Sequence, residues 1–233
     1  MVIDLTLPLN EQTLLIPEPG SGGSDYPTDS FQSTPLKTIA DDGVRISSFS
    51  QHTHTGTHTD APAHFIEDGK TIVEVSVDRL TGEATVIDLR DYRGELITPS
   101  VLETEASTLE AGDRAVFLTG DVDTHFHQVE EPTLTTLFEE ASAFSVAAAE
   151  WIADRDLAMV ANDFVTEASD LAIGKPYYPD RPGHKAILGA GIPIVEYLCN
   201  VDRIVDVGTI ELSCLPLPLS GLEAAPTRAI ARR

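Results

Sequence analysis

Several features are missing from this sequence, and each absence narrows what the protein can be. No apolar run is long enough to cross a membrane. The first residues carry Asp4 and no basic segment, which argues against a secretory signal, so we expect a cytoplasmic protein. Cysteine occurs only at Cys199 and Cys214, with no Cys-x-x-Cys spacing, and we expect two reduced core residues. A Gly-x-Ser-x-Gly sequence is also absent, which disfavours a serine nucleophile.

Positive charge is scarce as well. The chain has 15 Lys plus Arg against 38 Asp plus Glu, a formal net charge of −23. Such a surface would repel a phosphate backbone, which excludes nucleic acid as a partner. Lysine is rarer than arginine, and carboxylate-rich, lysine-poor proteins are typical of hosts that live in molar salt, where ions screen the self-repulsion. We favour this halophilic interpretation over an acidic protein kept soluble by its charge in ordinary salt.

Apolar residues make up 42% of the 233 residues, enough for a sizeable core, and we treat residues 1–233 as one domain. Alternating or continuous apolar stretches predict seven strands: Val2–Leu7, Val44–Ser50, Ala84–Leu89, Ala115–Thr119, Leu157–Val160, Ile192–Val195 and Ile210–Leu215. Helix signals are fewer: a start at Thr98-Pro99, a helix over Ser145–Arg155, and a short one over Ala186–Leu188. The sequence therefore predicts a mixed α/β fold with a strand-rich core. The Gly- and Ser-rich stretch Pro17–Pro35 is expected to be a functional loop or lid.

Four of the seven histidines lie between positions 52 and 64. His54, His58 and Asp60 offer imidazole and carboxylate groups, which suit zinc or manganese. On a straight strand, residues four apart are separated by about 13 Å. Two nitrogens bound to one ion must lie within about 4 Å of each other. The chain must therefore bend between the two histidines, and Gly56 at the midpoint permits that bend. A chance cluster of surface histidines explains this spacing poorly.

The stretch from His54 to His64 reads His-x-Gly-Thr-His-x-Asp-x-Pro-x-His and resembles the signature of the cyclase family of metal-dependent hydrolases, which includes kynurenine formamidases and isatin hydrolases. Further segments resemble the family over most of the chain: residues 3–9, Thr119-Gly120, the stretch from His184 to Asn200, and the C-terminal residues 215–229.

The resemblance implies a swivelling β/β/α domain in a homodimer or homotetramer. It also implies that His54, His58 and Asp60 bind one ion, and that Asp60 and Glu196 bridge to a second ion also bound by His184. His64 would be the catalytic acid/base. The cofactor would be one or two divalent ions per subunit, with zinc favoured and manganese the alternative. The partner would be a small-molecule substrate.

The function that this resemblance implies is hydrolysis of a small N-formyl or aryl amide, as in an arylformamidase. Two alternatives stay open: a ring-opening hydrolase of the isatin type, or a lactone- or cyclase-type enzyme with the same site. A non-enzymatic, metal-binding structural protein is the remaining rival, and the presence of His64 speaks against it.

Other candidate residues have more ordinary interpretations. His52 is expected to be solvated or hydrogen-bonded more than to support the site, and His125 and His127 to lie in a surface loop. Asp163 stands where many family members carry an Asp-Thr-x-Ser segment that is altered here, so a substrate role is doubtful. Tyr177 and Tyr178 are expected in a loop that could line a pocket for an aromatic ring.

Overall fold

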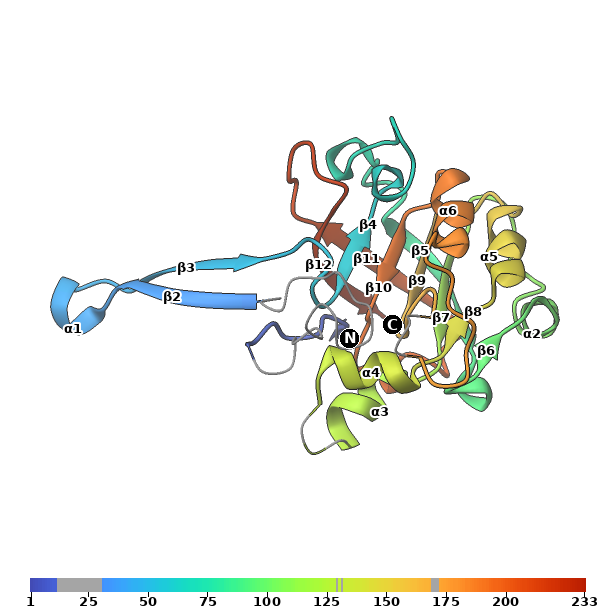
Figure 1. Ribbon diagram of the computed structural model, residues 1–233, viewed down its shortest axis with the longest axis horizontal. Coiled ribbons are helices and arrows are strands. Elements are labelled where there is room, and N and C mark those ends of the chain that lie inside the picture. The colour runs from blue at the N-terminus through green and yellow to red at the C-terminus, as the bar shows by residue number, and fades with distance from the viewer. Residues whose placement is uncertain (12–30, 129, 131, 169–171) are drawn as a thin grey trace.

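A closed β-barrel forms the centre of the molecule (Figure 1), which is described from a computed structural model over residues 1–11, 31–128, 130, 132–168 and 172–233. The strands follow one another in the order β1 (Val2–Asp4), β12 (Ala224–Arg232), β11 (Thr209–Pro216), β5 (Thr81–Asp88), β7 (Arg114–Leu118), β9 (Met159–Asn162), β10 (Ile194–Glu196) and β4 (His58–Asp60). The sheet closes because β4 pairs with both β10 and β12. Strands β5, β7, β9 and β10 run parallel, and the other pairings are antiparallel.

Successive side chains of a barrel strand point alternately into the barrel and to its outer face, and they belong to two different apolar clusters. In β5, Val86 belongs to the cluster inside the barrel, and its neighbour Ile87 belongs to the cluster on the outer face. Val116 and Phe117 of β7 divide in the same way. The outer cluster packs under three helices, α2 (Pro99–Glu105), α5 (Val146–Ala153) and α6 (Pro182–Gly189), which lie together on one side of the barrel (Figure 1).

A third apolar cluster joins α3 (Asp121–Gln128) and α4 (Leu134–Glu140) to the barrel. A short parallel ladder of β6 (Leu96–Ile97) and β8 (Ala143–Phe144) precedes α2 and α5. Single 3₁₀ turns complete the described chain: η1 (Pro62–His64), η2 (Ile72–Glu74), η3 (Arg90–Tyr92) and η4 (Val201–Arg203).

One hairpin leaves this body as an arm (Figure 1, left). Its strands are β2 (Phe31–Lys37) and β3 (Ile46–Gln51), and the helical turn α1 (Ile39–Asp42) forms its tip. Gly43 ends α1 with φ 69°, a left-handed conformation that glycine adopts without strain. β3 leads directly into the histidine-rich segment, so the arm and the candidate site are continuous in the chain.

The predicted mixed α/β fold with a strand-rich core is confirmed, and all seven predicted strands have a counterpart. The prediction of a loop over Pro17–Pro35 is wrong for residues 31–35, which form part of β2, while residues 17–30 lie outside the described chain. The third helix begins at Pro182, four residues earlier than predicted, because Arg181 is left-handed at the N-cap and proline suits the first turn.

The two cysteines are buried and free, as predicted. Over the described residues, the helices are all too short or too polar to cross a membrane.

Candidate metal centre

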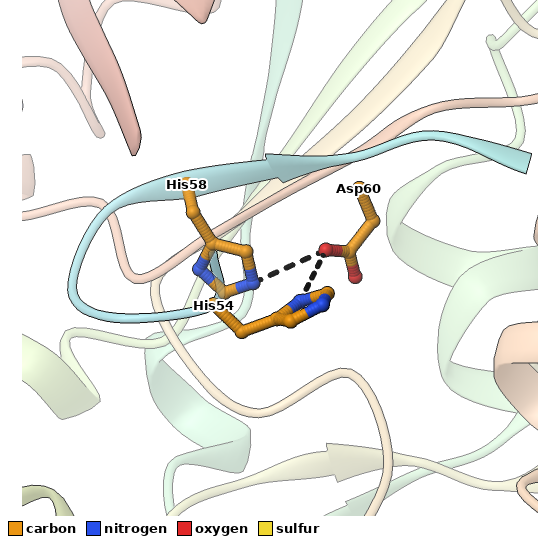
Figure 2. Close-up of side chains that lie close together, drawn as sticks. All are labelled: His54, His58 and Asp60. Carbon is orange, nitrogen blue, oxygen red and sulfur yellow. Dashed lines mark ion pairs between the residues drawn. The ribbon is translucent and has the colours of Figure 1, made fainter. Parts of the chain in front are cut away.

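The predicted bend between His54 and His58 is present. Gly56 has φ 64°, which glycine adopts without a steric penalty. The bend turns both imidazoles toward one carboxylate oxygen, as Figure 2 shows. The Nδ1 atom of His54 lies 2.8 Å from Oδ1 of Asp60, and the Nε2 atom of His58 lies 3.2 Å from the same oxygen.

Strand register brings Glu196 to this group. In the antiparallel pair of β10 and β4, Glu196 stands opposite His58, and Ile194 stands opposite Asp60. Since Ile194 packs in the cluster under the helices, these alternate positions face the outer, helix-covered side of the barrel. The Nε2 atom of His58 lies 3.6 Å from Oε2 of Glu196.

His184 reaches the same place from helix α6. It occupies the first turn of the helix, is 8% exposed, and its Nε2 atom lies 3.8 Å from Oε1 of Glu196. Two groups of possible ligands result: one of His54, His58 and Asp60, and one of Asp60, His184 and Glu196. Within each group the ligand atoms lie within 4.8 Å of one another, and Asp60 belongs to both.

The donor set fits a divalent cation. Both carboxylate oxygens of Asp60 and the Nε2 atom of His58 are buried and have no hydrogen-bond partner among the described residues. Buried polar atoms are costly to leave unpaired. A cation between them would satisfy all three, and the mixture of imidazole nitrogen and carboxylate oxygen suits zinc or manganese.

The nitrogens that point away from this centre have oxygen neighbours. Nδ1 of His58 donates to the carbonyl of Gly56 at 2.8 Å, which leaves the lone pair on Nε2. Nδ1 of His184 lies 2.9 Å from Oε2 of Glu167, and Nε2 of His54 lies 3.4 Å from Oε1 of Glu223. Sequence reasoning did not identify the two glutamates, because neither belongs to a spaced motif.

His64 stands beside the ligand groups without belonging to either. The turn η1 ends at this residue, and its ring centroid lies 4.0 Å from that of His54 and 6.1 Å from that of His184. The backbone at Gly69 packs closely against this turn. A Cβ at position 69 would lie 2.7 Å from the backbone carbonyl carbon of Pro62, so only glycine fits there. The imidazole is therefore placed next to both ligand groups.

The pKa shift of His64 differs from those of the candidate ligands. Burial would lower the pKa of His54, but Asp60 and Glu223 raise it to about 10. Burial also opposes ionisation of Asp60, yet the two neighbouring histidines hold its pKa well below its usual range. For His64, burial lowers the pKa to about 3, against the attraction of Asp60. The carboxylates thus attract positive charge, while burial disfavours the protonated form of His64.

The other histidines lie apart from the two ligand groups. His52 is partly buried, and burial together with the nearby His54 and His58 lowers its pKa to about 4. The expectation of a surface loop around His125 and His127 is wrong, because both lie on α3. His125 is buried, with Nε2 lying 2.7 Å from Oγ1 of Thr136.

Asp163 has a structural environment. Its two carboxylate oxygens accept the backbone N–H groups of Thr119 and Gly120, each at 2.7 Å, at the turn that follows β7. Tyr178 is partly exposed and lines a cavity of about 280 Å³ together with Phe144 and Glu167. This cavity adjoins the centre through Glu167, the neighbour of His184.

The chain is similar to several known proteins. A kynurenine formamidase of Erythrobacter litoralis is 28% identical over 81% of this chain and 77% of that protein. A solved structure named "Potential Metal-Dependent Hydrolase With Cyclase Activity" is 25% identical, covers 100% of this chain and 98% of the other, and has a TM-score of 0.68. An isatin hydrolase from Ralstonia solanacearum, 23% identical, shares the fold with a TM-score of 0.76 over 99% of this chain and 91% of its own. The family model described as "Putative cyclase" matches residues 3–167, and the chain belongs to that cyclase family.

Proposed function

We propose that this chain is a metal-dependent amidohydrolase that cleaves the C–N bond of a small N-formyl or aryl amide. The observation that carries the proposal is the buried Asp60 carboxylate, whose oxygens make no hydrogen bond among the described residues and which belongs to both ligand groups. His54 and His58 would hold one divalent ion with it, and His184 and Glu196 a second. Such ions lower the pKa of water toward neutrality and polarise a carbonyl oxygen.

The protein's own contribution to proton transfer would come from His64. His64 belongs to neither ligand group, so its imidazole stays free to accept the proton of the attacking water on a ring nitrogen. The same nitrogen can then deliver that proton to the leaving amine nitrogen. His64 lies next to one candidate ligand from each group, His54 and His184, so it would stand close to a bond that is cleaved at this centre.

The substrate class follows from the relatives. The name kynurenine formamidase recurs among them, which favours an N-formyl amide on an aromatic amine. The fold shared with isatin hydrolase favours a second candidate, ring opening of a cyclic aryl amide by the same residues. We favour zinc as the ion, with manganese as the alternative, because the ligands combine imidazole nitrogens and carboxylate oxygens.

A substrate panel tests this proposal. Purified protein, with its metal content measured on the same sample, would be assayed with N-formylkynurenine, formanilide and isatin. We expect turnover of at least one formyl amide and a divalent ion in the active sample. Hydrolysis of isatin alone would select the second candidate, and no hydrolysis of any of the three by metal-loaded protein would contradict the proposal.

We also propose that the chain works as a homodimer in which each arm packs against the other subunit. Leu36, Ile39 and Phe49 on the arm are 60%, 64% and 62% exposed. The arm contacts the described body mainly at its base, where Phe31 packs on the third apolar cluster. Two isolated strands are marginally stable in water, so an arm that exposes several large apolar side chains needs a packing partner. A second copy of the chain provides this partner. In a dimer with twofold symmetry, the arm of each subunit packs against the barrel and helices of the other subunit.

Replacing Phe49 and Leu36 with serine should weaken this dimer. Removal of two large apolar side chains from an interface costs several kcal/mol when both are buried there. We expect sedimentation or light scattering to show a monomer at concentrations where the wild type is dimeric. Val77→Ser, which changes an equally exposed residue on the body (61%), is the control and should leave the dimer intact. A double variant with unchanged mass would show that the arm is not the interface.

We propose that the protein is halophilic, because its net charge is strongly negative, and cytoplasmic, because its cysteines are free. The salt dependence of its stability tests the halophilic interpretation. With a net charge of −23, screening by molar KCl should relieve self-repulsion. We expect the thermal midpoint to fall markedly when the salt concentration drops to about 0.05 M, far below molar screening. Equal midpoints in dilute and molar KCl would contradict the interpretation.

A further inference from the structure

We propose that Glu167 is a positioning residue that fixes the tautomer of His184 and thereby makes the second metal position; this inference rests on the proposed function. Glu167 lies outside both ligand groups, yet its side-chain carboxylate is buried beside the ligand histidine that comes from the helix. Its function follows from three hydrogen bonds at one helix end.

The carboxylate of Glu167 holds the first turn of α6 and the imidazole together. Its Oε1 accepts the backbone N–H of Gly183 at 3.0 Å, and its Oε2 accepts the backbone N–H of His184 at 3.0 Å. The same Oε2 lies 2.9 Å from Nδ1 of His184. An ionised carboxylate only accepts hydrogen bonds, so in the neutral imidazole that a metal ion requires, Nδ1 carries the proton and Nε2 keeps its lone pair.

That lone pair points toward the metal position. Nε2 of His184 lies 3.8 Å from Oε1 of Glu196, and the two residues share a ligand group with Asp60. Histidine ligands of metals ordinarily donate their other ring N–H to a carboxylate or a carbonyl, which fixes the ring and raises its basicity. Glu167 accepts this second hydrogen bond from His184, and the Gly56 carbonyl accepts the corresponding one from His58.

Gly183 leaves the room that this contact requires. A Cβ at position 183 would lie 3.0 Å from Cδ of Glu167 and 3.2 Å from its Oε2. The backbone there does not demand glycine, because its φ is not positive. Glycine at this position is therefore explained by the close approach of the carboxylate.

Glu167→Gln is the direct test. The glutamine amide replaces one acceptor oxygen with an NH₂ group of similar size. If the NH₂ lies at the Oε2 position, it donates to Nδ1 and favours the tautomer protonated on Nε2, which cannot bind a metal through Nε2. In the opposite orientation it faces the N–H of Gly183. We expect zinc titration of the metal-free protein to show two ions for the wild type, and a second-ion affinity lowered about 10- to 100-fold in the variant.

A spectroscopic measurement separates positioning from mere support of the fold. In histidine-labelled metal-free protein, at a pH where the His184 ring is neutral, its ¹⁵N shifts should report Nδ1–H in the wild type and a larger Nε2–H population in Glu167→Gln. Glu223→Gln is the matched control, since Glu223 lies beside His54 of the other ligand group and its remaining carbonyl can still accept. It should leave the second ion and the His184 shifts unchanged.

Gly183→Ala provides a second variant should Glu167→Gln fail to fold. Alanine favours the helix but crowds the carboxylate, so the second ion should again bind more weakly while α6 is retained. Two ions bound with wild-type affinity by Glu167→Gln, or by Gly183→Ala in its place, would overturn the inference and leave the proposed function standing. A wild type that binds no second ion would instead overturn the two-metal site, and the inference with it.

Discussion

Asp60→Asn will remove both metal ions and abolish hydrolysis. One Asp60 oxygen lies within 3.2 Å of nitrogens from both His54 and His58, and Asp60 also belongs to the group with His184 and Glu196. A neutral amide supplies one weak acceptor where a bridging carboxylate supplies two charged ones. Metal catalysis contributes several kcal/mol, and about 4 kcal/mol corresponds to a loss of roughly a thousand-fold in kcat/KM.

Metal content and kcat/KM measured on the same samples check this result. Asp68→Asn is the matched control, because Asp68 is exposed, lies eight residues further along the chain, and has φ 60°, which asparagine tolerates. Metal-free Asp60→Asn should unfold more easily than metal-free wild type, because the substitution removes the buried charge that is paired with His54 and His58. Wild-type ion content and turnover in Asp60→Asn would exclude Asp60 from the site.

His64→Ala will keep the metal ions and lose turnover. His64 belongs to neither ligand group, yet its ring lies beside two of the proposed ligands. Loss of a general acid–base residue typically costs between about 10² and 10⁴ in rate. We therefore expect a fall of that size in kcat, with a much smaller change in KM and an unchanged ion content.

Added imidazole refines this test. A small base that enters the space left by the ring should restore part of the activity of His64→Ala, because the missing step is a proton transfer. His127→Ala changes an exposed histidine on α3 and should behave as wild type. If His64→Ala loses an ion along with activity, then His64 is a ligand and the proton-transfer role must be assigned elsewhere.

The local part of the site was predictable because its constraint is short-ranged. His54 and His58 are four positions apart, and the difference between about 13 Å on a strand and about 4 Å at a metal requires a bend. Only Gly56 in that interval combines the right position with freedom to adopt a positive φ, and the structure has that bend. Reasoning of this kind needs no knowledge of the rest of the fold.

The distant part of the site depends on register and packing. Glu196 joins His58 because β10 pairs with β4 in one particular alignment, and a shift of one residue would turn it inward. Neither Glu167 nor Glu223 forms a spacing pattern with the histidine it approaches, since each meets its partner through the tertiary fold. The family resemblance predicts Glu196 and His184 as ligands, whereas nothing in the sequence indicates that Glu167 and Glu223 lie at the site.

The arm shows a different limit of sequence reasoning. The sequence predicts a strand over Val44–Ser50, but it predicts a loop over residues 31–35, which belong to the partner strand β2. β2 is largely polar and contains Pro35, next to which the pairing shifts register, and these features oppose a strand in a sheet interior. They are tolerated here because the hairpin is exposed on both faces.

Metal removal and restoration, on whichever substrate the panel identifies, test the central claim most directly. The protein would be stripped with a chelator, checked for residual metal, and assayed before and after stepwise addition of zinc or manganese. We predict no turnover in the stripped protein, and recovery that tracks the binding of ions to the site built around Asp60. Full hydrolysis by protein that contains no metal would contradict the account.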